Sequence, residues 1–260
     1  MKRTVLLSLF VLGLAACGGA TATTSTTAAT SVADAPASSA ETPNDLSPGS
    51  IDIRTATMTD GTVITFGLIL PDTFDPALEY PVLLALPPGG QTVALMTSVA
   101  RETYLVEALA RGWVVITPAA PDGVLFFQGS ETYIPELLDT MSWIKPVGGR
   151  YHIAGVSNGG RSTFKIAALY PELFASALTF PGYPDEPTSA QALADLAKIP
   201  VAMFVGGDDP GWIGPMSETR DTLESLGGSV TLDIRSGEGH IMRSLSDGVD
   251  IFNFFDSVTP

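Results

Sequence analysis

Short apolar runs alternate with longer amphipathic stretches along most of this chain, and this alternation constrains the fold more than any other feature. Continuous apolar runs of this length suit parallel strands that are covered by helices on both faces of a sheet. The expected strands are residues 81–86, 113–117, 151–156, 201–205 and 230–234. The sequence therefore predicts a mostly parallel sheet with its helices in the connections.

The stretches between these runs have helical character and end close to a glycine or a proline, residues that interrupt helices. The expected helices are residues 97–110, 131–143 and 217–226, with Ser217 as the N-cap of the last one. Residues 51–70 instead alternate between apolar and polar on both sides of Asp60-Gly61, which predicts an antiparallel hairpin. Repeated alternation of strand and helix predicts an α/β sandwich with right-handed crossovers.

The first sixteen residues predict an export signal. Lys2 and Arg3 precede an apolar run that is too short to span a membrane as a helix. The run ends in "LAAC", which resembles the lipobox of bacterial lipoproteins, in which the cysteine becomes the lipidated first residue of the mature protein. Cys17 is the only cysteine, so no disulfide is expected. An ordinary secretory peptide with a chance cysteine is the alternative.

Residues 17–50 are expected to be a disordered tether between the lipidated Cys17 and a domain at 51–260. The tether is rich in Ala, Thr, Ser and Pro, so it cannot bury enough apolar surface to offset its ordering entropy. Gly18 stands where Asp would be the usual signal for retention in the inner membrane. This favours an anchor in the outer membrane or at the cell surface.

The formal charge of −15, without any run of Lys or Arg, argues against nucleic acid and anionic lipid surfaces as partners. Ligands of such sheets bind at the carboxyl ends of the strands. The segments that follow four of the expected strands are "PPGGQ" (87–91), Ser157, "GGDDPGW" (206–212) and "RSGEGH" (235–240). A serine, two carboxylates and a histidine are therefore expected at one edge of the sheet.

Ser157 lies in the pattern G-x-S-x-G, from Gly155 to Gly159, between a strand and a stretch that can form a helix. A nucleophile elbow has this form, because the sharp turn exposes the hydroxyl and the glycines avoid collisions with the adjoining strand and helix. The alternative is a serine in an ordinary tight turn.

A serine nucleophile needs a base, and the chain has only two histidines. His152 lies inside a strand and is expected to pack in the core or between strand and helix, whereas His240 follows the last strand. His240 is therefore the expected base. Asp208 and Asp209 are the candidates for the acid that orients it.

The negative oxygen of an acyl-transfer intermediate also needs hydrogen-bond donors. The amide of Asn158 is the first expected donor. The second comes from the loop after strand 81–86, in which Pro87 and Pro88 have no N–H to donate. Gly89, Gly90 and Gln91 remain as candidates.

Four segments now identify a resemblance over residues 51–260, namely "YPVLLALPPGGQ", "GGRYHIAGVSNGG", "ALYPELFASALTFPG" and "IPVAMFVGGDDPGW". They resemble the α/β-hydrolase superfamily and are similar to its secreted polyhydroxybutyrate depolymerase and feruloyl esterase-like group. The resemblance favours Asp209 over Asp208, because Asp209 completes the G-x-x-D spacing from Gly206. Pro87-Pro88 departs from the His-Gly that this group often carries, which leaves the second donor and the subfamily open.

The resemblance implies a compact serine esterase without a large cap domain, because only about 40 residues are expected between Ser157 and the next strand. Aromatic and polar residues in the loops are candidates for the substrate pocket: Phe126, Phe127, Gln128, Tyr183 and Trp212. No metal or other cofactor is expected, since there is no cluster of Cys and His ligands.

The sequence thus predicts a hydrolase that cleaves small-molecule or polymeric carboxylic esters. A peptidase of the prolyl-oligopeptidase type and a non-catalytic surface binding protein are the alternatives. The oligomeric state stays open.

Overall fold

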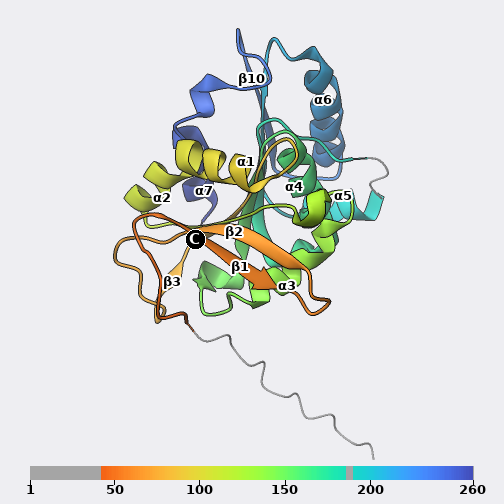
Figure 1. Cartoon of the computed structure of the whole chain (residues 1–260). Helices are drawn as coiled ribbons and strands as arrows, with labels where there is room; N and C mark the ends of the chain where they lie inside the picture. Colours follow the sequence, from red (N-terminus) through yellow and green to blue (C-terminus); the bar gives the residue numbers. More distant parts are fainter. Residues whose placement is uncertain (1–41, 186–189, 260) are drawn as a thin grey trace, which may run out of the picture. The chain divides into compact units, whose positions relative to one another are not determined.

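One mixed sheet organises the part of the chain that the computed structural model describes, residues 42–185 and 190–259 (Figure 1). Its eight strands in this part follow the order β1-β2-β5-β4-β7-β8-β9-β10. The strands are β1 Ile51–Thr57, β2 Val63–Ile69, β4 Val82–Leu86, β5 Val114–Pro118, β7 Tyr151–Gly155, β8 Phe174–Thr179, β9 Val201–Gly206 and β10 Val230–Arg235. β1, β2 and β5 pair antiparallel in turn, and every other pairing is parallel.

Helices cover both faces of this sheet. They are α1 Val93–Val99, α2 Leu105–Arg111, α3 Ile134–Asp139, α4 Asn158–Leu169, α5 Ala190–Leu196, α6 Pro210–Ser225 and α7 Val249–Val258. A π-helical turn, η1 Ala100–Tyr104, joins α1 to α2. Short 3₁₀ segments are η2 Pro121–Gly123, η3 Ser130–Tyr133, η4 Val147–Gly149, η5 Pro171–Leu173 and η6 Arg243–Leu245, and β3 Glu79–Tyr80 pairs with β6 Lys145–Pro146.

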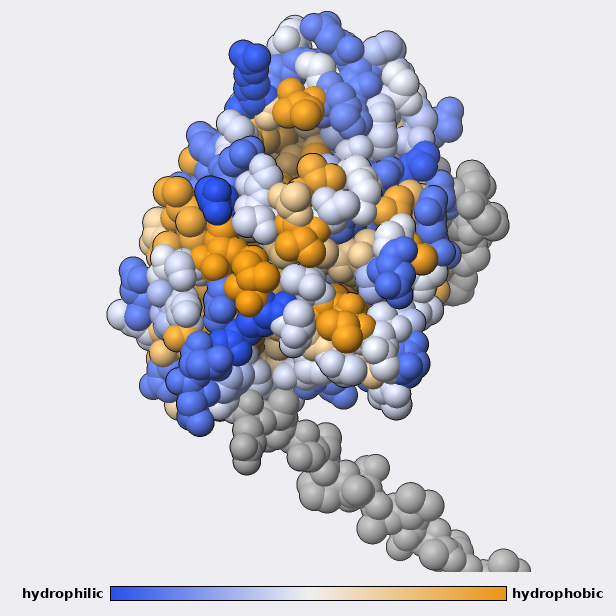
Figure 2. Space-filling model, in the orientation of Figure 1, coloured by the Kyte–Doolittle hydropathy of each residue, from blue (hydrophilic) through white to orange (hydrophobic). Residues whose placement is uncertain are grey.

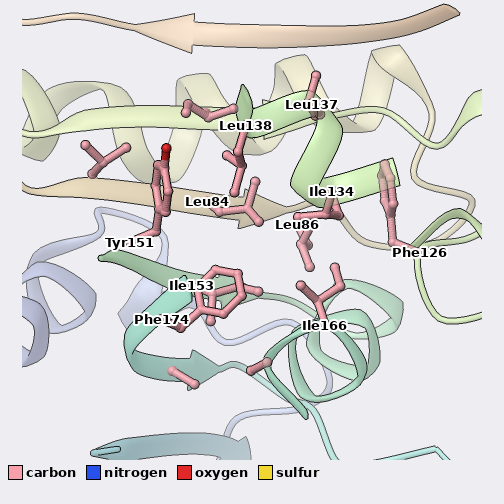
Figure 3. Packing of buried hydrophobic residues seen from close by; sticks show 14 of the residues in the cluster. Leu84, Leu86, Phe126, Ile134, Leu137, Leu138, Tyr151, Ile153, Ile166 and Phe174 are labelled. Carbon is pink, nitrogen blue, oxygen red and sulfur yellow. The ribbon is translucent and has the colours of Figure 1, made fainter. Parts of the chain in front are cut away.

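The strands have apolar residues on both faces, which gives the domain two cores. Along β4, Leu84 and Leu86 pack with the first core, whereas Leu83 and Ala85 pack with the second, as the two-residue period of a strand requires. Figure 3 shows the first core, which lies under α3 and α4. The second core lies under α2 and α7, on the opposite face of the sheet (Figure 1).

β8 was missed by the sequence analysis, so the distance from Ser157 to the next strand was overestimated. That strand begins at Phe174, and not about 40 residues after Ser157. Between Phe174 and Thr179 its sequence, FASALT, contains only small or weakly β-forming residues, and no glycine separates it from α4. Burial between β7 and β9, rather than intrinsic propensity, makes this segment a strand.

Three predicted helices differ in their bounds from the observed ones. The helix expected over 97–110 begins at Val93, because the side chain of Thr92 accepts a hydrogen bond from the Leu95 amide. The helix expected over 131–143 is α3 alone, preceded by a 3₁₀ turn. The helix expected over 217–226 begins at Pro210, directly after Asp209, where the ring of proline fits the first helical position.

The predicted hairpin is present, with its turn at residues 58–62 and Gly61 at φ +90°. Packing begins before residue 51, where the tether was expected to end. The Gly49 amide donates to the Leu70 carbonyl, and Arg54 forms an ion pair with Asp45. The predictions for residues 1–41, which include the signal, the lipidated Cys17 and most of the tether, lie outside the described residues. In the described part, no helix is both long and apolar enough to cross a bilayer.

His152 is buried in β7 between the rings of Trp113 and Phe255. Its Nδ1 lies 2.7 Å from the hydroxyl oxygen of Ser176. Burial, and to a lesser degree the charge of Arg150, lowers its pKa to about 4. His152 is therefore neutral at neutral pH and packs between strand and helix, as expected from its place in the sequence.

Candidate active site

Ser157 occupies a sharp turn between β7 and α4. Its backbone has φ +58° and ψ −116°, a conformation that non-glycine residues rarely adopt. A hydrogen bond of 2.8 Å from the Ser157 amide to the Pro181 carbonyl helps to hold the turn. Ser157 is partly exposed at the start of α4, so its hydroxyl lies above the edge of the sheet.

The glycines of G-x-S-x-G allow backbone segments to approach more closely than a Cβ would permit. A Cβ on Gly155 would lie 2.2 Å from the Gly159 carbonyl oxygen, and one on Gly159 would lie 2.1 Å from the Leu86 carbonyl oxygen. Gly160, which the pattern does not include, is as tightly enclosed by Pro181. These contacts place α4 directly against the end of β4.

His240 joins Ser157 to a carboxylate. Its Nε2 lies 2.9 Å from the Ser157 Oγ, and its Nδ1 lies 2.7 Å from the Asp209 Oδ2. The Asp209 side chain is 14% exposed and that of His240 is 39% exposed. The three residues thus form a continuous hydrogen-bonded chain from a sheltered carboxylate to a hydroxyl that solvent can reach.

Asp208 has a different role from Asp209. It is exposed, and its backbone amide donates to the Glu238 carbonyl at 2.8 Å. Together with a bond of 2.7 Å from the Gly207 amide to the Arg235 carbonyl, this ties the loop of the acid to the loop that carries His240. Of the two aspartates that the sequence left as candidates, Asp209 is the one whose carboxylate contacts the histidine.

The candidate donors for a negative oxygen lie in two places. The Asn158 amide is at the first position of α4, and its side chain donates to the Gly89 carbonyl at 2.9 Å. This bond holds the 87–91 loop against the serine turn. Gly89 and Gly90 remain the candidates for the second donor, and Gly89 lines the cavity beside Ser157.

Gln91 does not fit the role of donor. Its backbone amide already donates to the Pro88 carbonyl, and its side chain is fully buried. The side-chain nitrogen donates to Ser162 Oγ, and the side-chain oxygen accepts from the Phe126 amide. Gln91 therefore holds the loop in place through its buried side chain, and its own backbone is left-handed, with φ +50°.

A cavity of about 430 Å³ opens beside Ser157 and His240, on the face of the sheet that α1 and α7 cover. The residues expected to form the substrate pocket do not line it. Phe126 and Phe127 are buried, and Gln128 is exposed away from the cavity. The lining residues are Pro88, Gly89, Leu95, Ser98, Val99, Glu102, Thr103, Val156, Ser157, Phe180, His240, Ile241, Met242, Leu245 and Ser246.

Tyr183 and Trp212 lie on the other side of the histidine. The Trp212 ring packs on the His240 ring with centroids 5.0 Å apart, and Tyr183 packs on Trp212 at 5.0 Å. The Arg161 guanidinium lies over the Tyr183 ring and donates to its hydroxyl at 2.6 Å. The two predicted pocket aromatics thus form a wall behind His240.

The cavity residues and Arg161 were not predicted from the sequence. A signal for the cavity exists, because Leu95, Val99 and Thr103 recur at the spacing of one helix face directly after the 87–91 loop. Arg161 follows Ser157 by four residues, so it lies one helical turn further along α4. Among the described residues, no group of three or more His, Cys, Asp or Glu side chains is arranged to hold a metal ion.

Comparison with solved structures gives the fold a name. A ferulic acid esterase superposes with a TM-score of 0.62 at 16% identity, over 81% of this chain and 98% of its own. The fold is that of the α/β-hydrolases. A thermostable esterase matches with a TM-score of 0.61 at 19% identity, over 80% of this chain and 60% of its own.

A protein classed as a dipeptidyl aminopeptidase IV from Bacteroides ovatus shares the same α/β-hydrolase fold. It matches with a TM-score of 0.61 at 17% identity, over 81% of this chain and 35% of its own. The chain therefore spans less than two thirds of the thermostable esterase and about a third of the aminopeptidase. No protein-family model matches the chain. The predicted fold class is confirmed, and the described residues contain no large cap.

We predict that Gly159→Ala disrupts the serine turn, because its methyl group would overlap the Leu86 carbonyl oxygen. The expected loss is about 2 kcal/mol or more in the free energy of unfolding, measured by urea titration. Gly211→Ala is the control, since a Cβ there meets nothing within 4 Å, and it should leave stability unchanged or raise it slightly. Equal stability of the two variants would show that the close backbone approach is not required.

Proposed function

We propose that the chain is a serine hydrolase that cleaves carboxylic esters through an acyl-enzyme on Ser157. The observation that carries this proposal is the hydrogen-bonded chain Asp209–His240–Ser157 at the mouth of a cavity. A serine hydroxyl is a weak nucleophile unless a neighbouring base takes its proton, and Nε2 of His240 lies within reach to do so.

In the first half-reaction, the Ser157 oxygen bonds to the ester carbonyl carbon while its proton moves to Nε2 of His240. The carbonyl oxygen becomes negative, and the amides of Asn158 and of Gly89 or Gly90 are placed to stabilise it; removal of one such donor typically costs about 100- to 1,000-fold in rate. His240 then returns the proton to the alcohol oxygen as the carbon–oxygen bond breaks, which leaves the acyl group on Ser157.

In the second half-reaction, a water molecule gives its proton to His240 and bonds to the acyl carbon. Collapse of this intermediate releases the carboxylic acid and returns the proton to Ser157. Asp209 accepts a hydrogen bond from Nδ1 of His240 throughout, which keeps the other ring nitrogen directed at the serine and stabilises the charged imidazolium. These steps need no group beyond the three side chains, the amide donors and water.

The names of two structural neighbours, a ferulic acid esterase and a thermostable esterase, support ester cleavage over peptide cleavage. The aminopeptidase neighbour keeps the peptidase alternative open, since the same three groups can cleave amides. An amide is the poorer substrate of the two, because its nitrogen must be protonated before it leaves.

We predict that the purified protein hydrolyses p-nitrophenyl acetate and butyrate and does not cleave peptidyl p-nitroanilides. Ser157→Ala should lower kcat for ester hydrolysis by about 10,000-fold or more, while its thermal unfolding stays that of the wild type. Faster cleavage of the anilides than of the esters would favour the peptidase. Hydrolysis that Ser157→Ala leaves intact would rule out this site as its source, and a folded wild type that cleaves neither would favour the binding protein.

The two aspartates should respond differently to the same change. Asp209→Asn removes the charged acceptor for Nδ1 of His240, so we predict a loss of kcat of about 1,000- to 10,000-fold on the same esters. Asp208→Asn is the matched control, because only its backbone is used, and it should cost less than about threefold. A larger loss at Asp208 than at Asp209 would contradict the assignment of the acid.

A further inference from the structure

We propose that the cavity on the α1 side of Ser157 binds an uncharged aliphatic chain of the ester and so sets its specificity. This inference rests on the proposed function. The cavity is about 430 Å³, within the range of roughly 300–1,000 Å³ that is usual for small-molecule sites. Gly89, Ser157 and His240 all line the cavity, so it opens directly at the reacting ester group. The part of the substrate that enters it is therefore either the acyl chain or the alcohol chain of the ester.

The walls of the cavity match an aliphatic chain better than an aromatic acid. Leu95 and Val99 come from α1, Met242 and Leu245 come from the segment around η6, and Phe180 follows β8. Four of these five side chains are aliphatic or thioether groups, which adapt to a flexible chain. Tyr183 and Trp212 do not line the cavity, so Phe180 is its one Phe, Tyr or Trp ring among the described residues.

Two aromatic side chains and an arginine pack behind His240. The Trp212 ring packs against the imidazole at a tilt, the Tyr183 ring meets Trp212 edge-on, and the Arg161 guanidinium lies within 6 Å of both aromatic rings. Arg161 also forms an ion pair of 3.5 Å with Asp185. The cavity that opens beside the triad lies on the other, α1 side of His240.

Ile241 provides an independent sign of an apolar ligand. It follows His240 directly, lines the cavity, and is 81% exposed, the highest value among the exposed large apolar residues. Val93 of α1 is also exposed, and Figure 2 shows apolar surface over this helix. A chain that leaves the cavity past Ile241 would cover apolar surface that otherwise faces water.

The polar part of the lining disfavours a negative charge on this chain. Glu102 of η1 lies at the cavity and is exposed, and its carboxylate accepts a hydrogen bond of 2.9 Å from the Ser98 hydroxyl. Within residues 42–185 and 190–259, no Lys or Arg lines the cavity to balance a second carboxylate. A chain that ends in a carboxylate is therefore repelled by Glu102, while a neutral chain of equal length is not.

The test measures kcat/KM over two series of esters. One series varies the acyl chain from acetate to octanoate with p-nitrophenol fixed, and the other varies the alcohol of alkyl acetates from ethyl to octyl. Each methylene buried is worth up to about fourfold, so we expect a rise of at least tenfold along one series, which also tells which side of the ester enters the cavity. Flat profiles in both series, with Ser157-dependent hydrolysis of the acetate, would overturn the inference and leave the proposed function standing.

Val99→Phe should shorten the cavity and remove most of this rise. Val106→Phe is the matched control, since it makes the same change on α2, 68% exposed and outside the cavity. Ile241→Ser is a second cavity variant, for use if Val99→Phe does not fold, because an exposed side chain can be changed without loss of the core. It too should reduce the rise of kcat/KM with chain length. A rise that survives in both cavity variants would contradict the assigned site.

The charge is tested with the mono-p-nitrophenyl ester of adipic acid, which has the same length as the hexanoate but ends in a carboxylate. The wild type should prefer the hexanoate, and Glu102→Gln should reduce that preference about two- to fivefold. If Glu102→Gln leaves the preference for the hexanoate unchanged, Glu102 does not repel the charged chain. If Ser157→Ala hydrolyses every ester as fast as the wild type, the proposed function and this inference both fail.

Discussion

The site depends on the close approach of three backbone segments around Ser157. The ends of β4 and β7 and the first turn of α4 meet where Gly155 and Gly159 have no side chains, and the turn is held by a hydrogen bond from Ser157 to Pro181. Side chains at these positions would push α4 away from β4. The Asn158 amide, the Gly89 loop and the Ser157 hydroxyl would then no longer share one location, and Ser157 keeps its unfavourable left-handed backbone only because these surroundings fix it.

The histidine is positioned by contacts on both sides of its loop. Backbone bonds from Gly207 and Asp208 fix the base of the loop to the turn that carries Asp209. Trp212 supports one face of the His240 ring, and the cavity lies on the α1 side. The helices α1 and α7 cover one face of the sheet, and α4 and α6 cover the other (Figure 1). His240 has the Trp212 and Tyr183 rings on one side and the cavity with its aliphatic lining on the other.

The fold class and the parallel strands except β8 could be predicted from the sequence, because they follow from the period of the apolar residues. The members of the Ser–His–Asp chain could be predicted because histidine is rare in this chain. Two histidines leave few arrangements, and only His240 follows a strand at the correct edge. The choice between Asp208 and Asp209 needed the path of the loop, which a spacing of one residue does not determine. β8 was missed because its strand state comes from burial between neighbours. The aromatic residues predicted for the pocket do not line the cavity beside Ser157, and the sequence does not show on which side of the histidine such residues lie.

Covalent labelling tests the central claim most directly, namely that this arrangement makes Ser157 an activated nucleophile. The purified protein is treated with a fluorophosphonate, and the modified residue is located by peptide mass spectrometry. The account predicts one phosphonyl group per chain, attached to Ser157, with no labelling of Ser157→Ala and much slower labelling of His240→Ala. A folded wild type that stays unlabelled, or that is labelled at another residue, would contradict it.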